Sequence, residues 1–158
     1  MPSRSAGILA FRRHAQELEV LLVHPGGPFW RSKDLGAWSI PKGEYGSDED
    51  AETAARREFR EELGIALNEP LLPLGDVRQK GGKIVTAFAV EADIDVSTIQ
   101  SNTFELEWPP RSGRRQTFPE VDRAAWFDLA AAGVKINQGQ RALLERVAAR
   151  SDEAEPSA

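Results

Sequence analysis

The sequence contains no cysteine and no long apolar run. Without cysteine the chain has no disulfide, no thiolate metal ligand and no thiol nucleophile. No apolar run approaches the roughly 18 residues that a membrane helix needs, and the N-terminal MPSRSAG lacks the apolar core of a signal peptide. These absences predict a cytoplasmic protein that makes no contact with a membrane.

Acidic residues outnumber basic ones, with 25 Asp and Glu against 20 Lys and Arg, and the net charge is −5. A general nucleic-acid binder normally carries a basic surplus, so we expect no nucleic-acid polymer as a partner. A small anionic ligand is compatible with this balance, because local basic groups can lie within an acidic protein.

A length of 158 residues predicts a single domain, which would bury about two-thirds of the surface of its unfolded chain. We place this domain at residues 1–150, with no internal repeat and no interdomain linker. The segment 151–158, SDEAEPSA, is polar and contains proline, and is predicted to be disordered.

Short apolar runs separated by turn residues predict β-strands, which we place at residues 6–11, 19–23, 71–77, 84–90, 104–108 and 125–129. The segments HPGGPFWRSKDLG and PPRSGRRQTFPE are predicted to be loops. Apolar residues at helical spacing predict a helix over 137–149. Strands before and after a central helix, with a second helix at the end, indicate a mixed sheet covered by helices.

The central helix is predicted within residues 41–65, PKGEYGSDEDAETAARREFREELGI. Ser47 or Asp48 is expected to cap its N-terminus, and Gly64 is expected to end it. Acidic residues crowd the first turn, which favours a helix N-terminus.

Three glutamates of this helix, Glu58, Glu61 and Glu62, lie within roughly a third of its circumference at about 100° per residue. Like charges at this spacing weaken a helix by roughly 0.2–0.5 kcal/mol per pair, so something should offset the repulsion. Hard divalent cations such as Mg²⁺ would do so, because they take carboxylate oxygens as ligands. For three clustered glutamates alone, a solvated acidic surface is the alternative.

The same side of the helix carries Ala51, Ala54 and Ala55. Small residues there let another backbone segment come close to the carboxylates. Phe59 and Leu63 form an adjacent apolar flank that must face a core. We therefore place the glutamates beside the buried side of the helix.

The stretch resembles the Nudix box, which is Gly, five residues, Glu, seven residues, Arg-Glu, an aliphatic residue, one residue, Glu-Glu, one residue, Gly and an aliphatic residue. The matching positions here are Gly43, Glu49, Arg57, Glu58, Phe59, Glu61, Glu62, Gly64 and Ile65. Phe59 departs from the preferred aliphatic residue, which affects only core packing. The resemblance implies an α/β fold of the Nudix type: an α/β/α sandwich whose mixed sheet has the Nudix helix on one side and a C-terminal helix.

The resemblance also implies a metal-dependent hydrolase of nucleoside diphosphates linked to another group, with Mg²⁺ or Mn²⁺ as cofactor. By position, Glu58 and Glu62 would be the main metal ligands and Glu61 would assist, with a backbone carbonyl at Lys42–Gly43. Arg57, which we count with the catalytic residues, would act with Glu49 as a supporting pair that orients the helix and its loop.

A carboxylate near the metal would take the proton of the attacking water. Glu61 or Glu58 fits this role by position. Members of the family often supply an acid from a later loop before a Trp, and Glu120 lies six residues before Trp126. The alternative for Glu120 is a solvated loop residue.

The segment WSIPKG before the box is similar to that of diadenosine polyphosphate hydrolases and related Nudix enzymes, and marks Trp38 and Lys42 as substrate-binding candidates. A lysine there would reach the phosphate chain as a point charge. Arg115, in a loop with two further arginines, would contact distal phosphates or only increase solubility.

Aromatic side chains of Phe29, Trp30 and Trp108 either stack on a base or pack in the core. His14 and His24 fit no metal-ligand spacing, and we expect both to be ordinary loop or strand-end residues.

The predicted activity is hydrolysis of a phosphoanhydride bond in a nucleoside or dinucleoside polyphosphate, with a small nucleotide as substrate. One alternative is a hydrolase of oxidised nucleoside triphosphates, and another acts on diphosphoinositol phosphates but would need more basic residues. A third is a non-catalytic Nudix module that binds a nucleotide to regulate a partner. Such a module would be expected to lose box carboxylates, and none is lost here.

Overall fold

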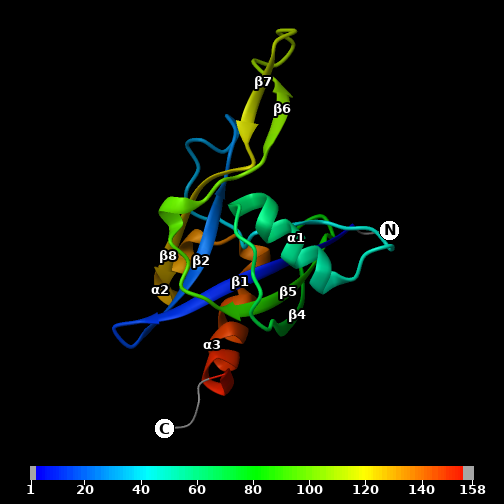
Figure 1. The fold of residues 1–158 in the computed structure, drawn as a ribbon. Helices are drawn as coiled ribbons and strands as arrows, with labels where there is room; N and C mark the ends of the chain where they lie inside the picture. Colours follow the sequence, from blue (N-terminus) through cyan, green and yellow to red (C-terminus); the bar gives the residue numbers. More distant parts are fainter. Residues whose placement is uncertain (1–2, 155–158) are drawn as a thin grey trace.

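The computed structural model describes residues 3–154, and its centre is a six-stranded mixed sheet (Figure 1). The strand order is β4-β5-β1-β2-β8, and the short β3 pairs with β1. β1 runs parallel to β5 and antiparallel to β2 and β3. The strands span Arg4–His14 (β1), Glu17–Pro25 (β2), Lys42–Glu44 (β3), Leu72–Arg78 (β4), Ile84–Glu91 (β5) and Val121–Asp128 (β8).

Helices cover both faces of this sheet. α1 packs on one face, and α2 and α3 pack on the other. The helices span Ala51–Leu63 (α1), Leu129–Lys135 (α2) and Ala142–Ala154 (α3), with short 3₁₀ turns η1 (Val96–Thr98) and η2 (Gln138–Gln140). The predicted α/β/α sandwich is therefore confirmed.

Strand β1 contributes to both cores because successive side chains of a strand point to opposite faces. Ile8 is fully buried on the α1 side, where it belongs to the same apolar cluster as Phe59 and Leu63. Leu9 is fully buried on the other side, in the cluster that contains Leu143 of α3. The apolar flank expected for the central helix thus faces a core.

A two-stranded sheet, β6 (Thr103–Glu107) and β7 (Arg115–Pro119), projects from the central sheet (Figure 1). The predicted loop PPRSGRRQTFPE is wrong in its second half, which forms β7. Phe104 and Phe118 are cross-strand partners whose ring centroids lie 6.0 Å apart. This aromatic pair stabilises a hairpin that the turn residues of the segment obscured.

The last strand was predicted at residues 125–129, whereas β8 begins four residues earlier, at Val121, and ends one residue earlier, at Asp128. The Asp128 carboxylate accepts a hydrogen bond from the Ala131 N–H and caps α2, a helix that the sequence did not predict. Its short length left too few periodic positions to detect.

The predicted helix over 137–149 is interrupted. Asn137 caps the 3₁₀ turn η2, and α3 begins only at Ala142. α3 then continues to Ala154, into the segment that was predicted to be disordered. The buried Ser151 hydroxyl donates to the Ala148 carbonyl at 2.9 Å. Residues 155–158 lie outside the described residues.

Among residues 3–154, no helix is both long and apolar enough to cross a membrane.

Candidate active site

The residues at the two ends of α1 define where this helix begins and ends, and so where its glutamates lie. The N-cap is Asp50, not Ser47 or Asp48, and its side chain makes no capping hydrogen bond. At the other end Gly64 has φ 73° and its N–H donates to the Arg60 carbonyl at 2.7 Å, as predicted. A left-handed conformation of this kind favours glycine.

Glu58 and Glu62 lie one helical turn apart and are each only 8% exposed, whereas Glu61 is half-buried. An oxygen of Glu62 accepts a hydrogen bond from the backbone N–H of Lys42 at 3.3 Å. Two carboxylates buried side by side are costly unless hydrogen bonds or counter-charges compensate them.

The backbone of β3 approaches these carboxylates at Gly43. A β-carbon placed on Gly43 would lie 2.1 Å from Cδ of Glu58. A side chain at this position would displace the Glu58 carboxylate, so glycine is needed to keep that carboxylate where it lies. The small residue that permits this approach is Gly43 itself, whereas Ala54 and Ala55 of the helix are buried in the apolar cluster on the α1 side of the sheet.

Arg57 holds the acidic residues of this region together. Its Nε and Nη2 donate to the two carboxylate oxygens of Glu49, both at 2.9 Å, and its Nη1 donates to Glu58 at 2.7 Å and to Glu61 at 3.2 Å. These bonds hold the pKa of Glu49 below its usual value and raise the pKa of Arg57. The Arg57–Glu49 pair is formed as expected and ties α1 to the loop before it.

Glu120, between β7 and β8, lies beside the same carboxylates. Burial raises its pKa, and the negative charges of Glu58 and Glu61 raise it further. The Asn102 side-chain amide, oriented by its hydrogen-bonding surroundings, donates to Glu120 at 3.2 Å. The structure therefore brings Glu120 close to the glutamates of α1, from a connection between two strands that is distant in sequence.

Burial and crowding of like charge dominate the electrostatics. Burial raises the pKa of Glu62 to about 8, with further contributions from Glu58 and Glu120. Burial also raises the pKa of Glu58, against the effect of Arg57. Burial lowers the pKa of Lys42, which the nearby carboxylates partly counteract.

The donor set fits a hard divalent cation. Crowded carboxylates with raised pKa values are sites where a cation would replace repulsion by attraction. Within residues 3–154, no three acidic or imidazole groups are already arranged as a metal cage. Glu58 is bonded to Arg57 through Oε1 and Glu62 to the Lys42 N–H through Oε2, so each carboxylate has a second oxygen that could coordinate an ion.

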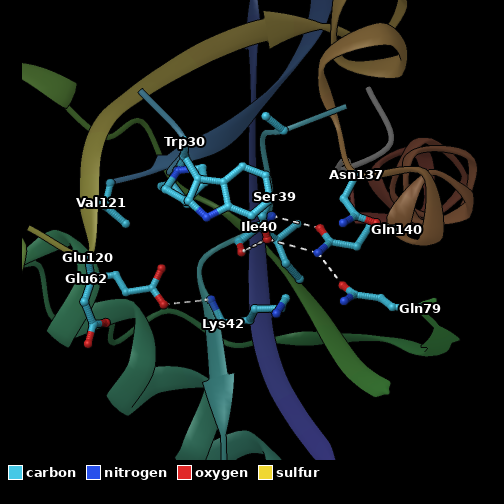
Figure 2. A pocket seen from close by; sticks show the side chains of 13 residues that line it. Trp30, Ser39, Ile40, Lys42, Glu62, Gln79, Glu120, Val121, Asn137 and Gln140 are labelled. Carbon is cyan, nitrogen blue, oxygen red and sulfur yellow. Dashed lines mark hydrogen bonds between the residues drawn. The ribbon is translucent and has the colours of Figure 1, made fainter. Parts of the chain in front are cut away.

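A cavity of 280 Å³ opens beside these groups (Figure 2). Glu62 and Glu120 lie at one end of it and the amide side chains of Gln79 and Gln140 at the other, with Lys42 between. The remaining lining residues are Val23, Pro25, Trp30, Ala37, Ser39, Ile40, Val121 and Asn137. The cavity thus joins a charged end to a neutral end.

Two predicted substrate-binding residues lie elsewhere. Trp38 is 4% exposed, packs edge-on against His24 and Phe127, and does not line this cavity. Its indole is therefore a core side chain rather than a stacking surface. Arg115 is on the projecting hairpin, 68% exposed and paired with Glu105 at 3.6 Å, and is not brought together with the glutamates.

His24 is not the ordinary strand-end residue that we expected. It is fully buried, and its Nε2 donates to the Lys33 carbonyl at 2.6 Å while Nδ1 lies 2.8 Å from Asp122. The ring thereby connects the loop that carries Trp30 to β8. No local pattern indicates this role, because the hydrogen-bond partners are distant in sequence or belong to the backbone.

Gln79, Asn137 and Gln140 are lining residues that sequence reasoning missed. They come from the turn after β4 and from the region of η2, and only the fold brings them together. Asn137 alone had a detectable signal, as a favoured N-cap residue before a helical pattern.

Comparisons with known proteins agree with this architecture. A family model described as NUDIX domain matches residues 1–147. RNA pyrophosphohydrolase of Caulobacter vibrioides is 38% identical over 64 residues, which is 37% of this chain and 37% of that protein. The aligned region therefore spans little more than a third of this relative.

Two solved structures resemble the fold over nearly the whole chain. A binary complex of the C. elegans Ap4A hydrolase has a TM-score of 0.67 and 22% identity, covering 96% of this chain and 98% of that one. The NUDIX domain of Shewanella oneidensis NrtR, complexed with ADP ribose, has a TM-score of 0.66 and 18% identity, covering 96% and 89%. At these identities the similarity concerns the fold.

Proposed function

Because the chain belongs to the NUDIX family, we propose that it hydrolyses a phosphoanhydride bond in a nucleoside or dinucleoside polyphosphate with the help of a divalent cation. The observation that supports this most is the shared cavity. Glu62 and Glu120 lie at one end, with the buried carboxylate of Glu58 on the same helix as Glu62, and Lys42 lies between this end and the other. A phosphate chain at that end would meet both the cation ligands and a basic group.

Nudix hydrolases generally use divalent metal ions, and we assign Mg²⁺ or Mn²⁺ to the carboxylates of α1. Glu58 and Glu62 would be the principal ligands, Glu61 would assist, and the carbonyl at Gly43 would add an oxygen. A bound cation supplies neutralisation of the phosphate charge and a lower pKa for water.

The protein's own residues would position the phosphate chain and remove a proton from the attacking water. Lys42 offers a positive charge to the phosphate oxygens. Glu120 is the favoured general base, since its raised pKa and its hydrogen bond from Asn102 suit a carboxylate held ready to accept a proton. Glu61 is the second candidate for this role. Arg57 keeps Glu58 and Glu61 in place.

Phosphoanhydride cleavage at the 5′ end of an RNA is a second candidate substrate class. The similarity to RNA pyrophosphohydrolase favours it, whereas the acidic net charge of −5 does not. A regulatory module that only binds nucleotide is the third possibility, although all box carboxylates are present.

A panel of Mg²⁺-dependent reactions tests the proposal. It should include dinucleoside polyphosphates, nucleoside triphosphates, ADP-ribose, nucleotide sugars and a 5′-triphosphorylated RNA, with products separated by chromatography. We expect turnover of at least one nucleotide, abolished by EDTA. Turnover of RNA alone would select the second candidate. Binding of nucleotides without any turnover would contradict the proposed activity and support the regulatory module.

A further inference from the structure

At the neutral end of the cavity, where Gln79 and Gln140 lie, one backbone N–H determines which amide groups donate and which accept hydrogen bonds. The N–H of Ile40 donates to Oε1 of Gln140 at 3.0 Å, and a backbone N–H can only donate. Gln140 is fully buried, so its amide orientation is settled by this bond. Its Nε2 must therefore donate to whatever it contacts.

The orientation of the Gln140 amide in turn determines the orientation of the Gln79 amide. Nε2 of Gln140 donates to Oε1 of Gln79 at 2.7 Å and to the hydroxyl of Ser39 at 3.0 Å. Because the oxygen of Gln79 accepts this bond, its amide is oriented, and its NH₂ is the group for which the described residues provide no hydrogen-bond partner. Figure 2 shows these amides lying together along one side of the cavity.

Asn137 has the same polarity for an independent reason. Its Oδ1 accepts a hydrogen bond from the N–H of Gly139 at 2.9 Å, as the cap of η2. Its own backbone N–H donates to the Trp38 carbonyl at 2.7 Å, which fixes its position. The NH₂ of Asn137 therefore remains available to a ligand, at the same end of the cavity as Gln79.

The other walls of this end suit a flat apolar ring. Val23, Ala37 and Ile40 are buried aliphatic side chains of the lining. Trp30 is 36% exposed and also lines the cavity, where its ring is available for stacking. The carboxylates of Glu62 and Glu120 lie at the opposite end, and Lys42 lies between the two ends (Figure 2).

We infer that the neutral end is a nucleobase subsite that selects bases with a carbonyl at the edge facing Gln79 and Asn137, and disfavours bases with an amino group there. Both available protein groups are donors, so they pair with carbonyl oxygens and ring nitrogens and oppose an exocyclic NH₂. The inference rests on the proposed function, because it takes the ligand to be a nucleotide.

Hypoxanthine and adenine provide the sharpest comparison, because they have the same size and differ at the 6-position, oxo in one and amino in the other. IMP and AMP have no phosphoanhydride bond, so their binding is measured independently of hydrolysis. We expect calorimetric titration to give IMP at least about tenfold tighter binding than AMP, since the amino group meets a donor and leaves it unpaired.

Asn137→Asp replaces the NH₂ donor by a carboxylate oxygen, which accepts hydrogen bonds. The cap of η2 is kept, because the other aspartate oxygen can still accept from the Gly139 N–H. We expect this variant to lower the ratio of IMP to AMP affinity by at least about tenfold. Gln138→Glu is the matched control: the residue is exposed, adjacent and outside the cavity lining, and introduces the same charge. It should leave the ratio unchanged. Gln79→Met, which removes the other donor, serves if Asn137→Asp fails to fold.

Each outcome separates this inference from the proposed activity. Equal affinities, tighter binding of AMP, or no binding of either nucleotide at millimolar concentration would overturn the subsite. An unchanged ratio in both cavity variants would also overturn it. Preferred binding of IMP without hydrolysis of any triphosphate would leave the subsite in place and contradict the proposed activity. Equal hydrolysis of ITP and ATP, with equal binding of IMP and AMP, would support the proposed activity and overturn the subsite.

Discussion

The α-carbon of Gly43 faces the carboxylate of Glu58, and a β-carbon there would lie 2.1 Å from Cδ and 2.1 Å from Oε2. The atoms in the way belong to the far end of a flexible side chain. An added methyl group would therefore displace the carboxylate more readily than the backbone. We expect it to impair the candidate site and to leave the fold intact.

Gly43→Ala should lower metal-dependent turnover about 10- to 100-fold, the range seen when groups that support metal ligands are altered. The thermal midpoint should change little. Gly46→Ala is the matched control, because its nearest neighbour is Asp48 Oδ1 at 3.1 Å, outside the site. Equal activity of both variants would show that the position of Glu58 is unimportant.

Arg57→Lys should also reduce turnover by about 10- to 100-fold, because an ammonium cannot bond both oxygens of Glu49 and still reach Glu58. The guanidinium makes all of these contacts at once. Arg60→Lys, an exposed position of the same helix, should have no effect. Steady-state rates at saturating substrate distinguish the two, and full activity of Arg57→Lys would contradict the supporting role.

The metal-free protein should become less stable as the pH rises from about 5 to 8. The pKa of Glu62 is raised from 4.5 to about 8 by burial and by Glu58 and Glu120. Between these two values the folded state binds more protons than the unfolded state, so the free energy of unfolding falls with rising pH. Urea denaturation in EDTA across this range measures the slope.

Glu62→Gln should flatten that dependence, since the amide does not titrate. Glu52→Gln, an exposed position on the same helix, should retain it. A pH dependence that is the same in all three proteins would assign the effect to other groups.

Most of the sheet and the central helix followed from the sequence, because alternating apolar runs and the Nudix box depend on local spacing. β7 and α2 did not. The strand β7 is defined by the partnership of Phe118 with Phe104, across a turn rich in polar residues. The seven-residue α2 depends on its cap at Asp128.

The site was predictable to the extent that it lies on one helix. Glu58, Glu62 and the Arg57–Glu49 pair were anticipated, since they belong to a continuous motif. Burial of Trp38 was not, because WSIPKG does not specify which side of the chain packs inward. The amides of the cavity come from segments that only the tertiary fold brings together.

His24→Asn should lower the free energy of unfolding by about 1–3 kcal/mol, the cost of leaving buried hydrogen-bonding groups unsatisfied. The shorter amide cannot reach both the Lys33 carbonyl and Asp122, which the imidazole bonds at 2.6 and 2.8 Å. His14→Asn is the matched control at an exposed strand end. Urea denaturation at fixed pH should separate them, and equal midpoints would show that His24 does not anchor the loop.

Cation binding by the helix α1 is the claim on which the account depends most, and Mn²⁺ titration followed by electron paramagnetic resonance tests it directly. The wild-type protein and Glu52→Gln should remove free Mn²⁺ from solution with the same affinity. Glu62→Gln should bind it at least about tenfold more weakly, since one carboxylate ligand is lost. Equal Mn²⁺ binding by all three proteins would contradict the assignment of the cation to these glutamates.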